Sequence, residues 1–131
     1  PELTLIMSHG GYPFVNEAIF ACMRNANVYM DLSEYELAPM GDVYAQALST
    51  VIADKVVFAS AHPFVEQGEA INIYRNLNLS EEVWNKVMYE NAAKILGLGG
   101  RRASQSSGAV KPYGNALPMP FLPFVPGGSP R

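Results

Sequence analysis

Three short apolar runs divide the first part of this sequence at similar intervals. They cover residues 3–8, 28–32 and 56–60. Nearly continuous apolar runs of this length are typical of strands that are covered on both faces, as in a parallel sheet. The segments between the runs repeat apolar residues at helical spacing, and helices are the usual connections between parallel strands. The sequence therefore predicts an α/β fold with a parallel βαβαβ order.

Four helices are predicted, over residues 13–24, 42–53, 65–75 and 80–97. Pro13 suits the first turn of the first helix, and Asp42 is expected to be the N-cap of the second. Ser80 is the expected N-cap of the last helix and Gly97 its stop signal. The first helix has a stripe of apolar residues that should face the core: Phe14, Val15, Ala18, Ile19 and Cys22.

Composition changes sharply after residue 98, and we expect two regions, 1–98 and 99–131. The second region is rich in Gly, Pro and Ser and has no periodicity. Because prolines cannot continue a helix or donate to a sheet, it should be an extended or disordered tail. An alternative is an arm that lies in a groove of a partner, since residues 121–125 (Phe-Leu-Pro-Phe-Val) are strongly apolar.

Charge and cysteine content exclude several classes of protein. Residues 1–98 contain five Lys/Arg and twelve Asp/Glu, so no nucleic-acid-binding face is expected. Cys22 is the sole cysteine, which rules out an intrachain disulfide and favours a reducing, cytoplasmic location, with Cys22 as a core residue. No apolar run is long enough to span a membrane. The chain starts at Pro1 almost directly in a strand, which suggests a piece of something longer or a processed subunit.

His9 is the strongest candidate for chemistry. It follows the first strand and precedes Gly10 and Gly11, which should form a tight turn and let a substrate approach. An imidazole at a strand end can bind a metal or act as a general base, because it gains and loses a proton near neutral pH. The alternative is a histidine at the rim that is only hydrogen-bonded to a neighbouring loop.

Four further residues are predicted to line the substrate site: Tyr12, Asp31, Ser60 and His62. Asp31 ends the second strand and would orient a histidine or hold a loop. If Ala61 points into the site, strand alternation makes His62 point away unless the chain has already turned. The chain has no His-x-His pair, cysteine cluster, phosphate loop or nucleophile elbow, so it contains no complete metal site.

Four ordered motifs resemble the C-terminal portion of the amidohydrolase-2 family, which includes metal-dependent hydrolases and the aminocarboxymuconate-semialdehyde and resorcylate decarboxylases. The resemblance covers about residues 1–98. The motifs are Pro-Glu-Leu…Ile-Met-Ser-His-Gly-Gly (1–11), Asn-Val-Tyr-Met-Asp-Leu-Ser (27–33), Lys-Val-Val-Phe-Ala-Ser-Ala-His-Pro-Phe (55–64) and Asn-Ala-Ala-Lys-Ile-Leu-Gly-Leu (91–98).

The resemblance implies a (β/α)₈ TIM barrel of which this chain supplies the sixth, seventh and eighth strands. Another chain, a missing segment or self-association would complete the barrel. His9 matches the histidine that ends the sixth strand and that polarises substrate or handles a proton in the family. Ala61 stands where the family usually has an aspartate that binds the metal, commonly Zn²⁺, and alanine has no donor atom.

The resemblance therefore implies a component of an enzyme that hydrolyses or decarboxylates a small carboxylated or carbonyl substrate, with His9 as the polarising or acid/base residue. Two alternatives stay open. The chain could be a non-catalytic, degenerate subunit of such a barrel, or it could be a fragment or an Asp-to-Ala variant of the enzyme.

Overall fold

A computed structural model describes residues 3–33 and 37–98. Three strands form one parallel sheet in the order β1-β2-β3: β1 (Leu5–Met7), β2 (Val28–Asp31) and β3 (Val56–Val57). In the register of the sheet, Leu5 pairs with Val28 and Met30 pairs with Val56. The predicted parallel βαβαβ arrangement is confirmed.

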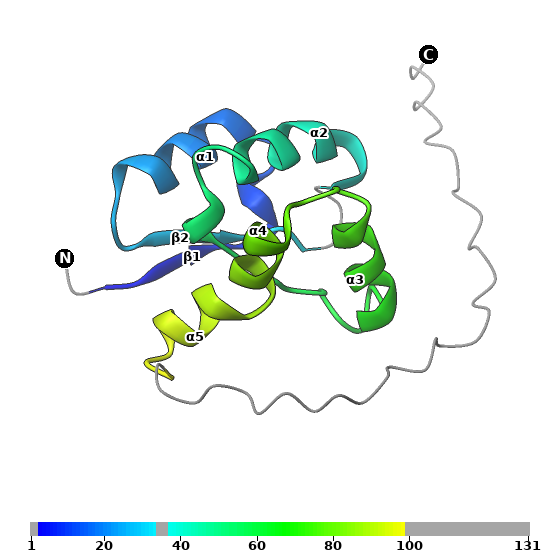
Figure 1. Cartoon of the computed structure of the whole chain (residues 1–131). Helices are drawn as coiled ribbons and strands as arrows, with labels where there is room; N and C mark the ends of the chain where they lie inside the picture. Colours follow the sequence, from blue (N-terminus) through cyan, green and yellow to red (C-terminus); the bar gives the residue numbers. More distant parts are fainter. Residues whose placement is uncertain (1–2, 34–36, 99–131) are drawn as a thin grey trace, which may run out of the picture.

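Helices and helical turns connect the strands of this sheet (Figure 1). The elements are η1 (Ser8–Gly11), α1 (Val15–Arg24), α2 (Leu37–Leu48), η2 (Ala53–Lys55), α3 (Gln67–Arg75), α4 (Glu81–Asn85), η3 (Lys86–Glu90) and α5 (Asn91–Ile95). The segments η1 and η2 are 3₁₀ turns, whereas η3 is a π-helical turn. Helices α1 and α2 lie together on one side of the strands (Figure 1), and η3 and α5 contact β3.

Helix α1 ends at Arg24 as predicted, but it starts at Val15 rather than near Pro13. Phe14 occupies the N-cap position and its side chain is 67% exposed, so its placement on the buried stripe was wrong. A residue outside the first turn does not share the face set by the helical period, which explains the difference. Val15, Ala18 and Cys22 are buried as expected.

The prediction for the second helix was wrong at both ends. Helix α2 starts at Leu37, five residues before the predicted N-cap Asp42, and ends at Leu48. Pro39 is compatible with this start because the first turn of a helix has N–H groups without partners in the helix, and the backbone departs from helical angles only at Met40. At the other end, the Thr50 hydroxyl donates to the Gln46 carbonyl at 2.7 Å and helps to terminate the helix.

The last helical region begins and ends at the predicted residues. The Ser80 Oγ accepts a hydrogen bond from the Val83 N–H at 3.3 Å. At the other end Gly97 has φ +67°, and the Leu98 N–H donates to the Ala93 carbonyl at 2.8 Å, as in a Schellman stop. The π-helical turn η3 in the middle was not predicted.

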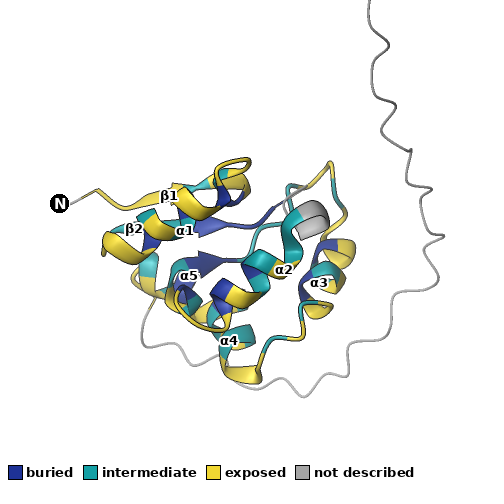
Figure 2. Ribbon diagram, turned by 90° about the horizontal axis from the view of Figure 1, so that it is seen from above, coloured by how far each residue is buried: buried dark blue, intermediate teal, exposed yellow. Residues whose placement is uncertain are grey.

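The core lies between the strands and the inward faces of the helices (Figure 2). Its fully buried large side chains are Tyr44, Tyr74, Met30, Leu32, Leu48, Ile52, Val56 and Val87. Phe58 packs edge-on against Tyr74 with ring centroids 5.2 Å apart. The core therefore joins β2 and β3 to the helices, and the partly buried Met7 of β1 packs against it.

The outer edge of β3 is covered by the end of the described chain. The Phe58 N–H donates to the Val87 carbonyl in η3 at 3.0 Å. The Asn91 Nδ2 donates to the carbonyls of Val56 and Ala53 at 2.7 and 2.8 Å, and Asn91 is buried. Backbone groups that an edge strand would otherwise expose are therefore satisfied by η3 and α5.

The outer edge of β1 differs from that of β3. In the described sheet β1 has a neighbouring strand on one side only, and Leu5 and Ile6 are 42% and 44% exposed. The expectation of a strand covered on both faces is therefore wrong within residues 3–33 and 37–98. The apolar run predicted the strand correctly, but coverage depends on neighbours that these residues do not supply.

No helix within the described ranges is both long and apolar enough to cross a membrane. The predicted tail, residues 99–131, lies outside the described part of the chain.

Candidate functional site

His9 sits in the turn that follows β1, at the carboxyl end of the sheet. Its backbone is in the left-handed region, with φ 56° and ψ 37°, and Gly10 follows with φ 57°. A non-glycine residue in this conformation costs about 1–2 kcal/mol, so surrounding contacts must hold it. Such strain is common at residues that a fold positions for function.

Two hydrogen bonds hold this turn. The His9 N–H donates to the Asp31 Oδ1 at 3.2 Å, and the Tyr44 hydroxyl donates to the Gly10 carbonyl at 3.0 Å. Asp31 ends β2 and Tyr44 lies on α2, so both neighbouring elements fix the position of His9.

The two glycines make room for protein side chains. A Cβ at Gly10 would overlap the Tyr44 hydroxyl and lie 3.0 Å from the Leu32 Cδ2, and Gly10 is buried. A Cβ at Gly11 would lie 2.5 Å from the Ala18 Cβ. We expected these glycines to let a substrate approach. In the structure they instead allow the turn to pack closely against β2, α1 and α2.

A buried carboxylate and hydroxyl lie next to His9. Asp31 and Ser33 are 8% and 5% exposed. The Asp31 Oδ1 accepts from the Ser33 N–H at 3.2 Å and from the Ser33 hydroxyl at 2.5 Å, besides the bond from His9. The His9 Nδ1 in turn lies 3.1 Å from the Ser33 Oγ and 3.3 Å from the Ser33 carbonyl oxygen. The structure thus joins Asp31, Ser33 and the His9 ring in one hydrogen-bonded chain.

The prediction that Asp31 orients a histidine agrees with this geometry. Its role as a substrate-lining residue stays a prediction, since it is buried and its Oδ1 is occupied by protein donors. Ser33 was not among the predicted site residues. The sequence feature that could have indicated Ser33 is its position two residues after Asp31. This spacing places both side chains on the same face of an extended chain.

The other predicted lining residues lie at separate positions. The Tyr12 N–H donates to the His9 carbonyl at 2.8 Å, while the Tyr12 side chain is half exposed. The Ser60 Oγ accepts from the His62 N–H at 3.2 Å, and the His62 Nδ1 lies 4.0 Å from a carboxylate oxygen of Glu66. The polar contacts recorded for Ser60 and His62 thus stay within residues 60–66, and their substrate-lining role stays a prediction.

The residues described do not fit a metal site by themselves. Over residues 3–33 and 37–98 there is no group of three or more His, Cys, Asp or Glu side chains that could hold an ion. Ala61, at the position where the family's aspartate is expected, has φ 56° and a methyl side chain without a donor atom. Donor atoms for zinc would therefore have to come from outside this set.

Cys22 is a core residue, as predicted. Its side chain has no exposed surface, and burial raises the pKa of its thiol to about 11. A thiol with such a pKa is almost fully protonated at neutral pH and is a poor nucleophile.

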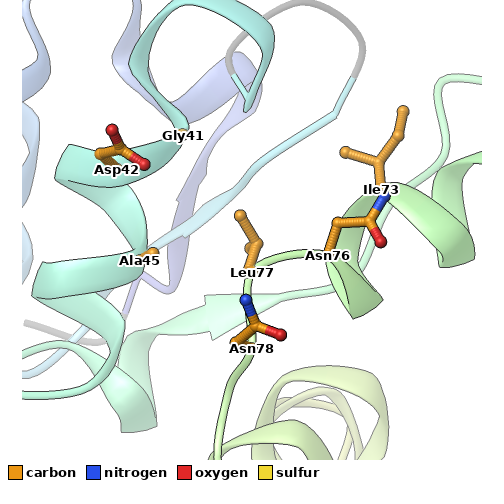
Figure 3. A pocket seen from close by; sticks show the side chains of 7 residues that line it. All are labelled: Gly41, Asp42, Ala45, Ile73, Asn76, Leu77 and Asn78. Carbon is orange, nitrogen blue, oxygen red and sulfur yellow. The ribbon is translucent and has the colours of Figure 1, made fainter.

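A separate pocket of about 360 Å³ lies between α2 and the end of α3 (Figure 3). It is lined by Gly41, Asp42, Ala45, Ile73, Asn76, Leu77 and Asn78. None of these residues belongs to the His9 group, so the pocket is distinct from the candidate site.

The sequence model of the family described as Amidohydrolase matches residues 1–98. No curated protein matches the chain. Solved structures with a similar fold include the following two. An uncharacterized TIM-barrel protein from Bordetella bronchiseptica has 29% identity and a TM-score of 0.69 over 77% of this chain and 36% of its own.

The second is a proposed 2-pyrone-4,6-dicarboxylic acid hydrolase from Pseudomonas putida, with 19% identity and a TM-score of 0.56 over 75% of this chain and 44% of its own. The predicted origin of the sheet in a TIM barrel is confirmed by these likenesses. The chain spans less than half the length of either structure.

Proposed function

This chain belongs to the amidohydrolase family, and on that premise we propose that it contributes a catalytic histidine to an amidohydrolase-like enzyme. The enzyme would hydrolyse or decarboxylate a small substrate that carries a carboxyl or carbonyl group. His9 is the proposed polarising or acid/base residue.

The observation that carries this proposal is the hydrogen-bonded chain of Asp31, Ser33 and His9 at the carboxyl end of the sheet. In TIM barrels the residues that perform chemistry lie at that end of the strands. The His9 turn adopts a strained backbone conformation and is held by two buried neighbours, Asp31 and Tyr44. These contacts hold His9 at the end of the sheet where a barrel places its chemistry, which supports the proposal.

The chemistry follows from the imidazole group. A protonated imidazole can donate a hydrogen bond to a substrate oxygen and stabilise the negative charge that develops there. A neutral imidazole can accept a proton from water or substrate. Both roles suit hydrolysis or decarboxylation of a carboxylated or carbonyl compound, and the hydrolase named for the Pseudomonas putida protein would fall in this class.

The remaining part of the site would come from other strands. The outer edge of β1 has no neighbouring strand in the described residues, and the Leu5 and Ile6 side chains on its two faces are exposed. We propose that further barrel strands, from another chain, from another segment or from self-association, cover this edge. The same strands would supply any metal ligands, because the residues described here do not form a metal site.

Ala61 favours one alternative function. Where a family aspartate is replaced by alanine, the barrel can keep its packing and lose its chemistry. The chain would then be a non-catalytic subunit of an amidohydrolase-like assembly. The single buried cysteine agrees with a reducing, cytoplasmic setting for either function.

Substitution of His9→Gln in the assembled enzyme tests the proposal. Two probe substrates cover the two reactions: 2-pyrone-4,6-dicarboxylic acid for hydrolysis, and a resorcylic acid for decarboxylation with release of CO₂. We expect turnover of the substrate that is accepted to fall by about 100-fold or more, the range expected for loss of an acid/base group.

Asn78→Gln is the matched control, because Asn78 also has a left-handed backbone, with φ 51°, and lies outside the His9 group. It should leave turnover unchanged. Full turnover in His9→Gln would contradict the catalytic role of His9. Absence of turnover in the wild-type assembly with both probes would favour the non-catalytic subunit.

A further inference from the structure

We propose that the π-helical turn η3, together with Asn91, is an edge cap that blocks the outer edge of β3 until a further strand displaces it. While this edge cap is in place, further strands pair with the sheet at β1. The identity of those strands rests on the proposed function, in which they complete the barrel. The edge cap itself depends only on contacts within the described residues.

Two residues of β3 and its continuation direct their backbone groups away from β2. In a parallel pair, residues that bond to one neighbouring strand alternate with residues whose N–H and C=O groups face the other way. The Phe58 N–H donates to the Val87 carbonyl at 3.0 Å, and the Val56 carbonyl accepts from the Asn91 Nδ2 at 2.7 Å. These groups of Val56 and Phe58 therefore lie at the edge where a closed barrel has its next strand.

The π-helical pattern releases the Val87 carbonyl for this contact. In an α-helix this carbonyl would accept from the N–H four residues later, which belongs to Asn91. In η3 the Asn91 N–H donates to the Lys86 carbonyl instead. The Val87 carbonyl accepts from the Phe58 N–H in its place. The π turn thus exchanges one helical hydrogen bond for one bond to the edge of the sheet.

The Asn91 side chain anchors the edge cap. Its Nδ2 donates to the carbonyls of Val56 in β3 and Ala53 in η2, and Asn91 is buried. The Val56 carbonyl has a second lone pair, so it can also accept from a further strand. The Phe58 N–H has one proton, and Val87 holds it. The edge cap and a closing strand therefore compete for the Phe58 N–H.

The edge of β1 presents no such competition. The Leu5 N–H donates to the Asn27 carbonyl at 2.9 Å, so Leu5 bonds toward β2 and the backbone groups of Ile6 point outward. Over residues 3–33 and 37–98 no strand lies beside this edge. A further strand can pair with β1 without displacing a described segment, whereas at β3 it must break the bond between Phe58 and Val87.

This difference gives assembly an order. A closed barrel has no free edge, so both β1 and β3 must finally meet a strand. Pairing at β1 comes first, and closure at β3 follows when a strand takes the Phe58 N–H from Val87. Until then the edge cap prevents copies of the chain from pairing through β3, which is the usual hazard of an open edge.

Deletion of Met88 tests the edge cap, because removal of one residue from an i→i+5 turn restores the i→i+4 pattern. The matched control is Met88→Ala, which removes the same side chain and keeps the chain length. By hydrogen exchange, the Phe58 amide should exchange about tenfold faster in the deletion variant than in the control, since it loses one hydrogen bond. The Leu5 amide should exchange equally in both. Equal rates for Phe58 would overturn the proposal.

Asn91→Asp tests the same contact at constant chain length, and it serves if the deletion variant does not fold. The carboxylate has the shape of the amide but no donor, so it would repel the carbonyls of Val56 and Ala53. Exchange of the Phe58 amide should accelerate about tenfold. Asn85→Asp, at an exposed position of α4, should leave it unchanged. An unchanged Phe58 rate in Asn91→Asp would also contradict the edge cap.

Sedimentation measures whether the edge cap blocks strand pairing. The Met88 deletion and Met88→Ala are compared in chains that also carry Ile6→Pro, which removes the outward N–H of β1. The deletion variant should self-associate at a concentration about tenfold lower, because one hydrogen bond no longer has to break. Equal association of the two chains would reject the blocking role.

The two proposals fail separately, since none of these measurements uses a substrate. If the Phe58 amide and self-association respond as expected but His9→Gln keeps full turnover, the edge cap stands and the catalytic role fails. If His9→Gln abolishes turnover while the Met88 deletion leaves Phe58 exchange unchanged, the catalytic role stands and the edge cap fails.

Discussion

Gly10→Ala should destabilise the fold strongly, because two separate costs combine at this position. Gly10 has φ +57°, and a side chain there costs about 1–2 kcal/mol in backbone strain. Its Cβ would also overlap the Tyr44 hydroxyl and lie 3.0 Å from the Leu32 Cδ2. Overpacking of a tight core costs about 1–3 kcal/mol. The free energy of unfolding should therefore fall by about 2–5 kcal/mol.

Two other glycines separate these costs. Gly97 has φ +67° but nothing within 4 Å of a built Cβ, so Gly97→Ala should show the backbone strain alone, about 1–2 kcal/mol. Gly68 lies in α3 with open space and no positive φ, and Gly68→Ala should raise the free energy of unfolding by about 0.5 kcal/mol.

Urea denaturation of the four chains, followed by circular dichroism, gives the free energies of unfolding. The difference between Gly10→Ala and Gly97→Ala isolates the overlap with Tyr44 and Leu32. Equal losses in these two variants would refute the packing described for the His9 turn. Loss of the Tyr44 bond to the Gly10 carbonyl should also shift His9, so the His9 NMR signals of Gly10→Ala should move while those of Gly97→Ala stay in place.

Two further predictions concern the core. Asn91→Leu should lower the free energy of unfolding by about 1–3 kcal/mol, because two carbonyls, of Val56 in β3 and Ala53 in η2, lose their donor. Thermal unfolding measures this loss, and a shift no larger than in exposed Asn85→Leu would contradict the covered edge. Burial raises the Cys22 pKa from its ordinary 9.0 to about 11, so the unfolded chain releases this proton at lower pH than the folded chain. The resulting stability is complete below pH 9 and is lost as the pH rises to about 11, by about 2–3 kcal/mol. Urea titrations of wild type and Cys22→Ala at pH 8 and above pH 10 should differ in this way, and an identical pH dependence would disprove it.

Local patterns predicted most of the elements. Strand β2 follows directly from a short apolar run, the end of helix α1 at Arg24 was predicted correctly, and Ser80 and Gly97 delimit the last helical region as cap and stop residues. These signals act over a few residues, so neighbouring sequence is sufficient to interpret them. Helix α2 was predicted to begin at Asp42 rather than at Leu37, although a proline such as Pro39 is compatible with the first turn of a helix.

The candidate site was predictable only in part. His9 and Asp31 stand at strand ends, and parallel strands bring such ends to one edge of a sheet, so their proximity follows from the order of elements. Ser33 was identified as a site residue only from its contacts in the structure. It bonds to Asp31, two residues away, and lies beside the His9 ring, which is 24 positions away in the sequence. Gly10 was predicted to let a substrate approach, but the Tyr44 side chain fills the space beside it.

The sequence by itself therefore determined the α/β order, the family and the histidine at the end of the first strand, because each is carried by residues close together in the chain. Tertiary structure alone decided which residues contact the His9 ring, what fills the space at Gly10 and which edge of the sheet is covered. These depend on distances between elements far apart in sequence, where a hydroxyl, a carbonyl or a methyl group placed a few ångströms away changes the outcome.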